Sequence, residues 1–245
     1  MCSNYRPVTR DDRLLAFFGV ERGRDEPSSD VFPSGLAPMI RLAYDDGTVS
    51  GGRLAIIDAI FRFVPDFVSK VEWAKRTYNA RTETVHERGS YKEAWAKGQR
   101  CVIPVEGFYE PYYDPADPKG KSVRWNIQQP GGVPMGIAGI YRTWTMPDGR
   151  ITYAMAMMTV NADDHPFMKR FHKPGDEKRM VVILDPVDYS KWLSCPVFEA
   201  KSLCKQWLGP LDGNSAPLPA RVPKHEAPKL PKPTPPPMPT TGNLF

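Results

Sequence analysis

Residues 134–160, Pro134-Met-Gly-Ile-Ala-Gly-Ile-Tyr-Arg-Thr-Trp-Thr-Met-Pro-Asp-Gly-Arg-Ile-Thr-Tyr-Ala-Met-Ala-Met-Met-Thr-Val160, contain two stretches rich in β-branched and aromatic residues. Such stretches favour strands when Gly, Pro or Asp bounds them. Between them, Met146-Pro-Asp-Gly-Arg150 combines the residues that tight turns prefer. The sequence therefore predicts a hairpin whose strands cover residues 134–144 and 152–160.

Four more strands are predicted on either side of this hairpin by the same criteria. They cover residues 38–44, 100–109, 123–127 and 179–184. Helices are favoured at residues 10–18, at 90–97 and directly after Asp185-Pro186, where Asp can cap a helix and Pro suits its first turn. Strands dominate and do not alternate regularly with helices. This order predicts an α+β fold with a mainly antiparallel, β-barrel-like core and flanking short helices.

The composition of the chain changes near Leu208. Residues 209–245 are rich in Pro and Lys, as in Lys229-Leu-Pro-Lys-Pro-Thr-Pro-Pro-Pro-Met-Pro239, and hold too few large apolar residues to fold alone. We expect a folded domain over residues 1–208 and a flexible, disordered, polyproline-like tail over 209–245. The chain ends in Thr241-Gly-Asn-Leu-Phe245, which resembles the sliding-clamp-binding peptide of bacteria, although Gln usually stands in place of Thr241. A frayed end is the alternative.

Bulk properties narrow the class of protein. The 245 residues are 41% hydrophobic, enough for a core, and the net charge of +5 suits a polyanionic partner as well as ordinary solubility. The start has no apolar signal core, and no stretch approaches the roughly 20 apolar residues of a membrane span. None of the four cysteines forms a C-x-x-C pair. We expect a monomer in the cytoplasm, associated with the nucleoid, with no membrane contact, metal or cofactor.

Cys2 directly follows the initiator Met1. If Met1 is trimmed, Cys2 carries an α-amine and a thiol on adjacent carbons, with ordinary pKa values of about 7.7–8.0 and about 8.5. The amine can attack an aldehyde to give a Schiff base, and the thiol can then close onto the imine carbon to give a thiazolidine ring. Many proteins carry Cys at position 2 by chance, so the rest of the chain has to decide.

Asn79, Arg81 and Glu83 alternate along Thr77-Tyr-Asn-Ala-Arg-Thr-Glu-Thr84. In an extended chain alternate side chains share one face. An amide and an Arg on one face can hold an oxygen-rich ligand, and Arg is well matched to phosphate. The alternative is a polar edge that faces solvent.

Two residues are candidates for proton transfer. Glu106 follows an apolar strand and precedes Gly107, where partial loss of water would raise the pKa of its carboxyl group. His172 precedes a Lys-Pro-Gly turn that leads into an apolar strand, and its ordinary pKa of about 6.5 suits a proton shuttle. Each could instead be a surface group, Glu106 paired with a base and His172 exposed on a loop.

Basic and aromatic residues are interleaved in Phe61-Arg-Phe-Val-Pro-Asp-Phe-Val-Ser-Lys70-Val-Glu-Trp73-Ala-Lys75-Arg76. Aromatic side chains stack on bases of single-stranded nucleic acid while Lys and Arg follow its phosphates. Lys70, Trp73, Lys75 and Arg76 are therefore candidate DNA contacts. The alternative is that the aromatic rings belong to the core and the charges to its solvated rim.

These segments, in this order, resemble the SRAP family (SOS response-associated peptidase-like proteins). The resemblance covers about residues 1–205, and the combination of its motifs is specific. The matching segments are Met1-Cys2, Phe63-Val-Pro, Asn79-Ala-Arg-Thr-Glu-Thr84, Arg100-Cys-Val-Ile-Pro-Val-Glu-Gly-Phe-Tyr-Glu110, Met158-Thr-Val-Asn-Ala162, and His172 ahead of Arg179-Met-Val-Val-Ile-Leu184.

The resemblance implies that mature Cys2 crosslinks to the ring-opened aldehyde of an abasic site in single-stranded DNA, with abasic-site lyase or self-reversal activity, in the response to DNA damage. It implies that Cys2 is the nucleophile, that Asn79 orients the adduct and that Arg81 grips phosphate. It also implies that Glu106 manages protons on the α-amine and that His172 assists Schiff-base formation and ring opening.

The chain departs from the family pattern at its start. The family commonly begins Met-Cys-Gly-Arg, whereas Ser3 and Asn4 stand here, and Pro111 replaces a common Trp after Glu110. Two other functions stay open. One is a thiol autopeptidase, with Cys2 as nucleophile and His172 or Glu106 as base. The other is a noncovalent reader of single-stranded or modified DNA that uses residues 61–76.

Overall fold

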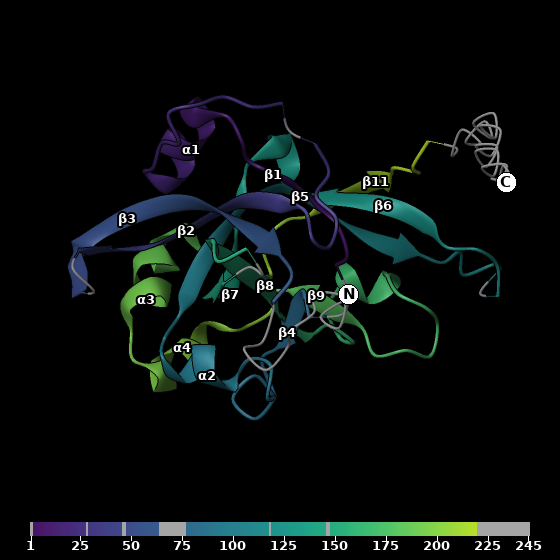
Figure 1. Cartoon of the computed structure of the whole chain (residues 1–245). Helices are drawn as coiled ribbons and strands as arrows, with labels where there is room; N and C mark the ends of the chain where they lie inside the picture. The colour runs from purple at the N-terminus through teal and green to yellow at the C-terminus, as the bar shows by residue number, and fades with distance from the viewer. Residues whose placement is uncertain are drawn as a thin grey trace, which may run out of the picture.

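Five strands close into a β-barrel in the computed structural model, which describes residues 2–27, 29–45, 48–63, 77–117, 119–145 and 148–219 (Figure 1). Strand β7 pairs with both β8 and β5, and the pairs β8–β3, β3–β2 and β2–β5 complete the ring. Only the β3–β8 pair in this ring is parallel. The predicted α+β class with an antiparallel, barrel-like core is confirmed. The barrel strands are β2 (Leu36–Asp45), β3 (Thr48–Phe61), β5 (Arg100–Tyr112), β7 (Met135–Thr145) and β8 (Ile151–Asn161).

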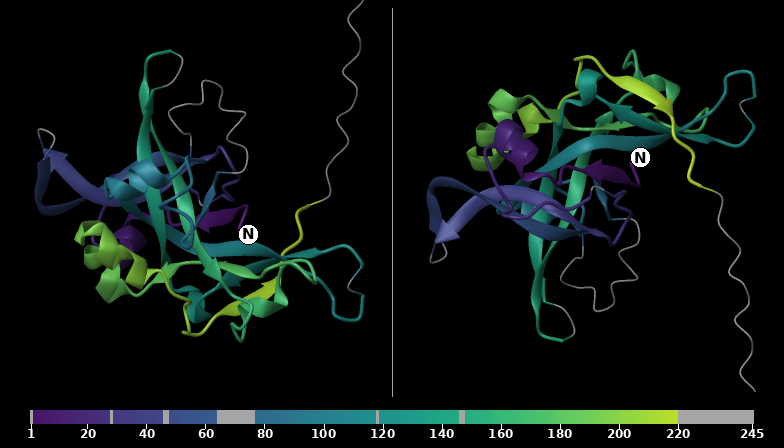
Figure 2. Two further views of the ribbon diagram at one scale, coloured as in Figure 1. Left: turned by 90° about the horizontal axis from the view of Figure 1, so that it is seen from below. Right: turned by 90° about the horizontal axis from the view of Figure 1, so that it is seen from above.

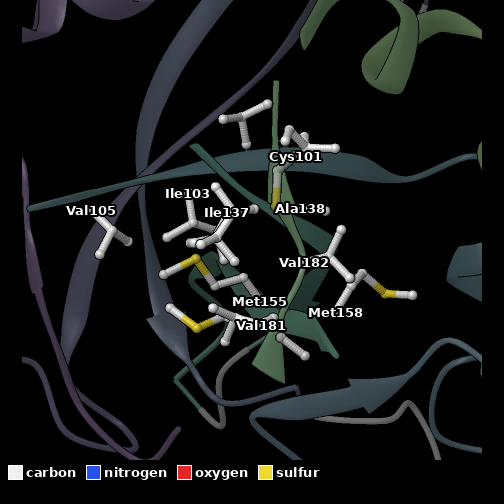
Figure 3. Close-up of a cluster of buried hydrophobic side chains, with 14 of the residues drawn as sticks. Cys101, Ile103, Val105, Ile137, Ala138, Met155, Met158, Val181 and Val182 are labelled. Carbon is white, nitrogen blue, oxygen red and sulfur yellow. The ribbon is translucent and has the colours of Figure 1, made fainter. Parts of the chain in front are cut away.

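Side chains fill the interior of the barrel. Cys101, Ile103 and Val105 alternate along β5, and each is fully buried (Figure 3). Residues at alternate positions face one side of a strand, so these three line the same wall. Gly139 of the neighbouring strand β7 faces this wall, and a Cβ atom at that position would lie only 2.8 Å from Cys101 Sγ. A residue larger than Gly at position 139 would therefore collide with Cys101. The barrel is therefore a packed core.

The hairpin predicted from residues 134–160 is present, with β7 and β8 in register from Gly139↔Met157 to Thr145↔Ile151. The predicted strand at 179–184 is divided into β9 (Arg179–Val181) and β10 (Ile183–Leu184). Strand β9 pairs with β8, whereas β10 pairs with β7. The chain therefore passes from one barrel strand to its neighbour at Val182.

Short helices cover one flank of the barrel, where α1 and α3 lie side by side (Figure 2). Phe18 of α1 stacks on Tyr189 of α3, with ring centroids 5.6 Å apart. The predicted cap is present, because the Asp185 side chain accepts a hydrogen bond from Val187 N. The helices are α1 (Asp11–Phe18), α2 (Lys92–Ala96), α3 (Tyr189–Ser194) and α4 (Val197–Leu203), with 3-10 turns η2 (Pro130–Gly132), η3 (Met168–Arg170) and η4 (Pro186–Asp188). None of the described helices is long and apolar enough to cross a membrane.

The sheet continues beyond Leu208, where the sequence places the start of the tail. Strand β11 (Asp212–Ser215) pairs antiparallel with β6 (Val123–Gln128). Its Gly213 packs against Trp125 and Phe167, where a Cβ would come within 3.0–3.2 Å of their rings. Residues beyond the predicted boundary therefore still form a strand, because the edge of β6 supplies hydrogen-bond partners. The clamp-like peptide at the C-terminus lies outside the described residues.

Candidate functional site

The start of the chain is held on both sides by backbone hydrogen bonds. Strand β1 (Tyr5–Pro7) pairs antiparallel with β5, with Tyr5 opposite Phe108. On its other side Tyr5 exchanges two backbone hydrogen bonds with Val31, at 3.2 and 2.8 Å. The Tyr5 ring is buried with its edge against Phe61. These contacts fix the position of the residues just before β1, including Cys2.

Cys2 is fully buried, and its thiol is neutral at physiological pH. Burial, together with the nearby Glu110 carboxylate, raises the pKa of the Cys2 thiol to about 12. Its Sγ donates a weak hydrogen bond to Asn4 O at 3.3 Å. Because the residue is enclosed, its chemistry depends on the few polar groups that share its surroundings.

Asn79 is the first of these groups. It begins β4 (Asn79–Arg81), which pairs parallel to β8 and so passes beside the N-terminus (Figure 1). Asn79 Nδ2 donates a hydrogen bond to Cys2 O at 2.7 Å. Tyr91 Oη donates to Asn79 O at 3.0 Å and so holds the backbone of β4. Within the described part of the chain, Asn79 Oδ1 is buried and has no hydrogen-bond partner. The structure thus brings together Cys2 and Asn79, and the role of Asn79 toward an adduct stays a prediction.

His172 and Glu110 form the second polar pair. His172 Nε2 lies 2.9 Å from Glu110 Oε2, and both side chains are buried. His172 has a positive φ of 65°, a conformation uncommon for a residue with a side chain. It is held there because its N–H donates to Pro111 O at 2.8 Å. Since Glu110 also acts on the Cys2 thiol, the imidazole, the carboxylate and the thiol belong to one buried cluster.

Glu106 does not lie beside Cys2, which corrects the position expected for it from the sequence. In the β1–β5 pairing, Arg6 lies opposite Gly107 and Pro7 opposite Val105, so Glu106 is the extra residue of a β-bulge. The bulge breaks the alternation along β5 and directs Glu106 toward α1. There Arg13 donates to both carboxylate oxygens at 2.8 and 2.7 Å. The residue next to Cys2 is Glu110, in the same sequence motif.

Arg81 and Glu83 do not share the buried face of Asn79. Arg81 is 46% exposed, and its Nη1 forms an ion pair with Glu177 Oε2 at 2.8 Å. Glu83 accepts two hydrogen bonds from Arg179, at 3.1 and 2.9 Å. Arg179 is almost fully buried and also donates to Thr159 O at 2.7 Å. The expected single face is therefore divided, with the amide inside at Cys2 and Arg81 at the rim.

A cavity of about 330 Å³ adjoins the cluster, and Ser3, Asn4, Tyr109, Glu110 and Arg124 contribute to its wall. The guanidinium of Arg124 stacks 3.3 Å over the Tyr109 ring. Its Nη1 donates to Ala216 O at 3.0 Å, and its Nη2 contacts Asp30. With the amide oxygen of Asn4 turned toward it, Arg124 Nε also donates to that oxygen at 3.0 Å. Asn4, where the chain departs from the SRAP pattern, is thus tied to the cavity wall.

Several predicted residues lie outside this description. Lys70, Trp73, Lys75 and Arg76 fall in residues 64–76, which the structure does not describe. In the described ranges, no group of three or more His, Cys, Asp or Glu side chains could hold a metal ion.

Residues 1–222 match the model of a protein family described as SOS response associated peptidase (SRAP). This chain belongs to that family. A crystal structure of a protein from Bordetella bronchiseptica is similar to the SRAP chain with a TM-score of 0.76 and 29% identity, covering 89% of this chain and all of the other. A protein from Bacteroides thetaiotaomicron, at 19% identity and a TM-score of 0.67, shares the fold, covering 87% and 91% of the two chains.

Two curated relatives carry the name abasic site processing protein HMCES. The mouse protein is 28% identical over 202 residues, which cover 68% of this SRAP chain and 53% of the mouse protein. The chicken protein is 28% identical over 215 residues, which cover 76% and 60%. The SRAP chain therefore spans about half the length of the curated relatives it matches.

Proposed function

We propose that this SRAP-family protein processes abasic sites in single-stranded DNA by forming a covalent thiazolidine crosslink through mature Cys2. The observation that carries the proposal is the position of Cys2, which is fully buried yet contacts the Asn79 amide and lies beside Glu110. The family membership and the names of the curated relatives support it.

The first step needs a free amine. Removal of Met1 turns the peptide nitrogen of Cys2 into an α-amine inside the cluster. The buried Glu110–His172 pair can take the proton from the ammonium form, because a carboxylate and an imidazole within hydrogen-bond distance of each other can act as a general base. The neutral amine then attacks C1′ of the ring-opened deoxyribose. The carbinolamine loses its hydroxyl group as water, with a proton returned by the same pair, and a Schiff base is formed.

The second step closes the ring. The thiol is protonated, because its pKa is about 12, so it reacts by passing its proton on as the sulfur bonds to the imine carbon. That proton ends on the former imine nitrogen, and the product is a thiazolidine. Aldehyde, amine and thiol combine with the loss of one water.

Asn79 and Arg81 position the DNA in this scheme. Asn79 holds Cys2 O, and its unpaired Oδ1 is available to the new N–H of the adduct. A buried polar atom without a partner costs about 1–3 kcal/mol, which the adduct would recover. Arg81, half exposed at the end of the same strand, faces solvent where a phosphate can approach. The Schiff base also allows abasic-site lyase chemistry, by loss of the C2′ proton and departure of the 3′ phosphate.

The test uses the mature protein and an oligonucleotide with one abasic site. We expect a band that survives boiling in detergent, with an intact mass equal to protein plus DNA minus one water. Cys2→Ala should abolish the band. The matched control is Cys204→Ala, which changes a half-buried cysteine at the end of α4 and should keep the band. No band from protein whose Met1 is shown by mass spectrometry to be absent would overturn the proposal. The peptidase activity in the family name stays a prediction for this chain.

A further inference from the structure

Arg81 of the SRAP chain is already occupied by a carboxylate. Arg81 lies at the end of β4, two residues after Asn79 and so about 7 Å along the strand from the residue that contacts Cys2. Its Nη1 lies 2.8 Å from Glu177 Oε2. Both side chains are partly exposed, 46% for Arg81 and 35% for Glu177, so a solvent-borne anion can reach the pair.

Glu177 is held independently of Arg81. Its Oε1 accepts hydrogen bonds from Arg179 Nη1 at 2.7 Å and from Asn161 Nδ2 at 3.3 Å. The hydrogen bond from Arg179 is the main reason that the pKa of Glu177 is lowered, so its charge is present at neutral pH. If Arg81 turned away, Glu177 would keep both partners. No buried charge would be left alone, because Arg179 is also paired with Glu83.

We propose that Glu177 is an intramolecular competitor for Arg81, which a DNA phosphate has to displace before Arg81 can grip the strand. The inference rests on the proposed function for its ligand class, a phosphodiester of single-stranded DNA. Phosphate and carboxylate both match the planar fork of Arg, so they compete for the same donors. Glu177 therefore weakens binding to every strand, damaged or intact. The covalent step at Cys2 then favours abasic strands, because only these supply an aldehyde.

The free energy of the Arg81–Glu177 ion pair is small, as a reversible exchange with phosphate requires. Exposed ion pairs contribute little to stability, so removing the competitor strengthens binding by about two- to five-fold. Neutral Glu177→Gln keeps the length of the side chain and its hydrogen bonds to neighbours. Glu199→Gln is the matched control. Glu199 is 40% exposed, has Lys191 as its cation and lies on α4, away from the N-terminus (Figure 2).

The experiment measures the Kd of a fluorescent, undamaged single-stranded oligonucleotide by anisotropy at fixed salt. We expect E177Q to bind about two- to five-fold more tightly than the wild type, and E199Q to bind like the wild type. In an Arg81→Gln background the effect of E177Q should vanish, because Arg81, the exposed cation that E177Q releases, is absent, and the buried Arg179 stays paired with Glu83. Circular dichroism checks that each variant is folded.

Three results would overturn the inference. The first is an equal gain in affinity from E177Q and E199Q, which would show a general effect of net charge. The second is a gain from E177Q that persists in the Arg81→Gln background. The third is weaker binding by E177Q than by the wild type. The outcome is separate from that of the proposed function. Suppose that the wild-type protein fails to crosslink abasic DNA but the E177Q variant shows the Arg81-dependent gain in affinity. This result would contradict the proposed chemistry of Cys2 and would still support Glu177 as a competitor for Arg81.

Discussion

Cys2 combines a reactive residue type with full burial, which gives its thiol an unusual dependence on pH. In the folded protein the pKa of the thiol is about 12, against about 9.0 when it is exposed. The unfolded chain therefore loses this proton first as pH rises. The stabilisation that the buried thiol provides is fully present below about pH 9 and is lost as pH approaches 12.

We predict that the free energy of unfolding falls more steeply above pH 9 in the wild type than in Cys2→Ser. The extra slope is at most about 1.4 kcal/mol per pH unit, the value for one proton. Urea denaturation at several pH values between 8 and 11 measures it. Other titrating groups are present in both proteins and cancel in the comparison. Parallel curves would contradict the burial of Cys2.

Glu106 and Glu110 provide a second comparison between single residues. We predict that Glu110→Gln slows crosslinking to an abasic oligonucleotide by about 100-fold or more, the usual contribution of a general acid or base. Glu106→Gln should keep the rate of the wild type, because Glu106 contacts Arg13 instead of the buried cluster. Single-turnover kinetics on denaturing gels gives both rates. A slow Glu106→Gln together with a normal Glu110→Gln would restore the assignment made from sequence.

At the scale of elements, most barrel strands could be predicted because their residues are β-branched, aromatic and bounded by turns. Strand β3 could not, since Gly51, Gly52 and Asp58 interrupt its pattern and its pairing with β2 supplies the missing preference. Helix α4 was also not predicted. The bulge in β5 is a tertiary feature. Glu106 and Glu110 are four positions apart, so simple alternation places them on one face, and only the bulge in the pairing with β1 separates them.

Strand β11 tests where the folded domain ends. A chain cut after Leu208 loses β11 and the hydrogen bond between Arg124 and Ala216 O. We predict that this lowers Tm by about 4–8 °C, from a loss of roughly 2 kcal/mol in a domain of this size. A chain cut after Pro219 keeps both contacts and should melt like the full chain. Equal melting of the two truncated proteins, measured by differential scanning calorimetry, would place the boundary back at Leu208.

In the whole molecule, the candidate site is assembled from parts that are far apart in the sequence. The chain start, the beginning of β4, the end of β5 and the loop before β9 each contribute one residue, namely Cys2, Asn79, Glu110 and His172. Sequence motifs could nominate three of these, because each motif holds a single obvious chemical group. They could not say which of two carboxylates in one motif reaches the others, nor that Glu177 meets Arg81, since both depend on how strands distant in the sequence pair.

The pairing of β1 with β5 has a consequence for the timing of synthesis. Once β5 has left the ribosome and paired with β1, Cys2 is enclosed. We expect an aminopeptidase to act while the first hundred or so residues are being translated, an interval of roughly 5–20 s at ordinary elongation rates. Chains that fold before Met1 is removed would keep Met1 and remain inactive. We expect strong overexpression to enlarge this fraction, visible by intact mass as molecules one methionine heavier that form no adduct.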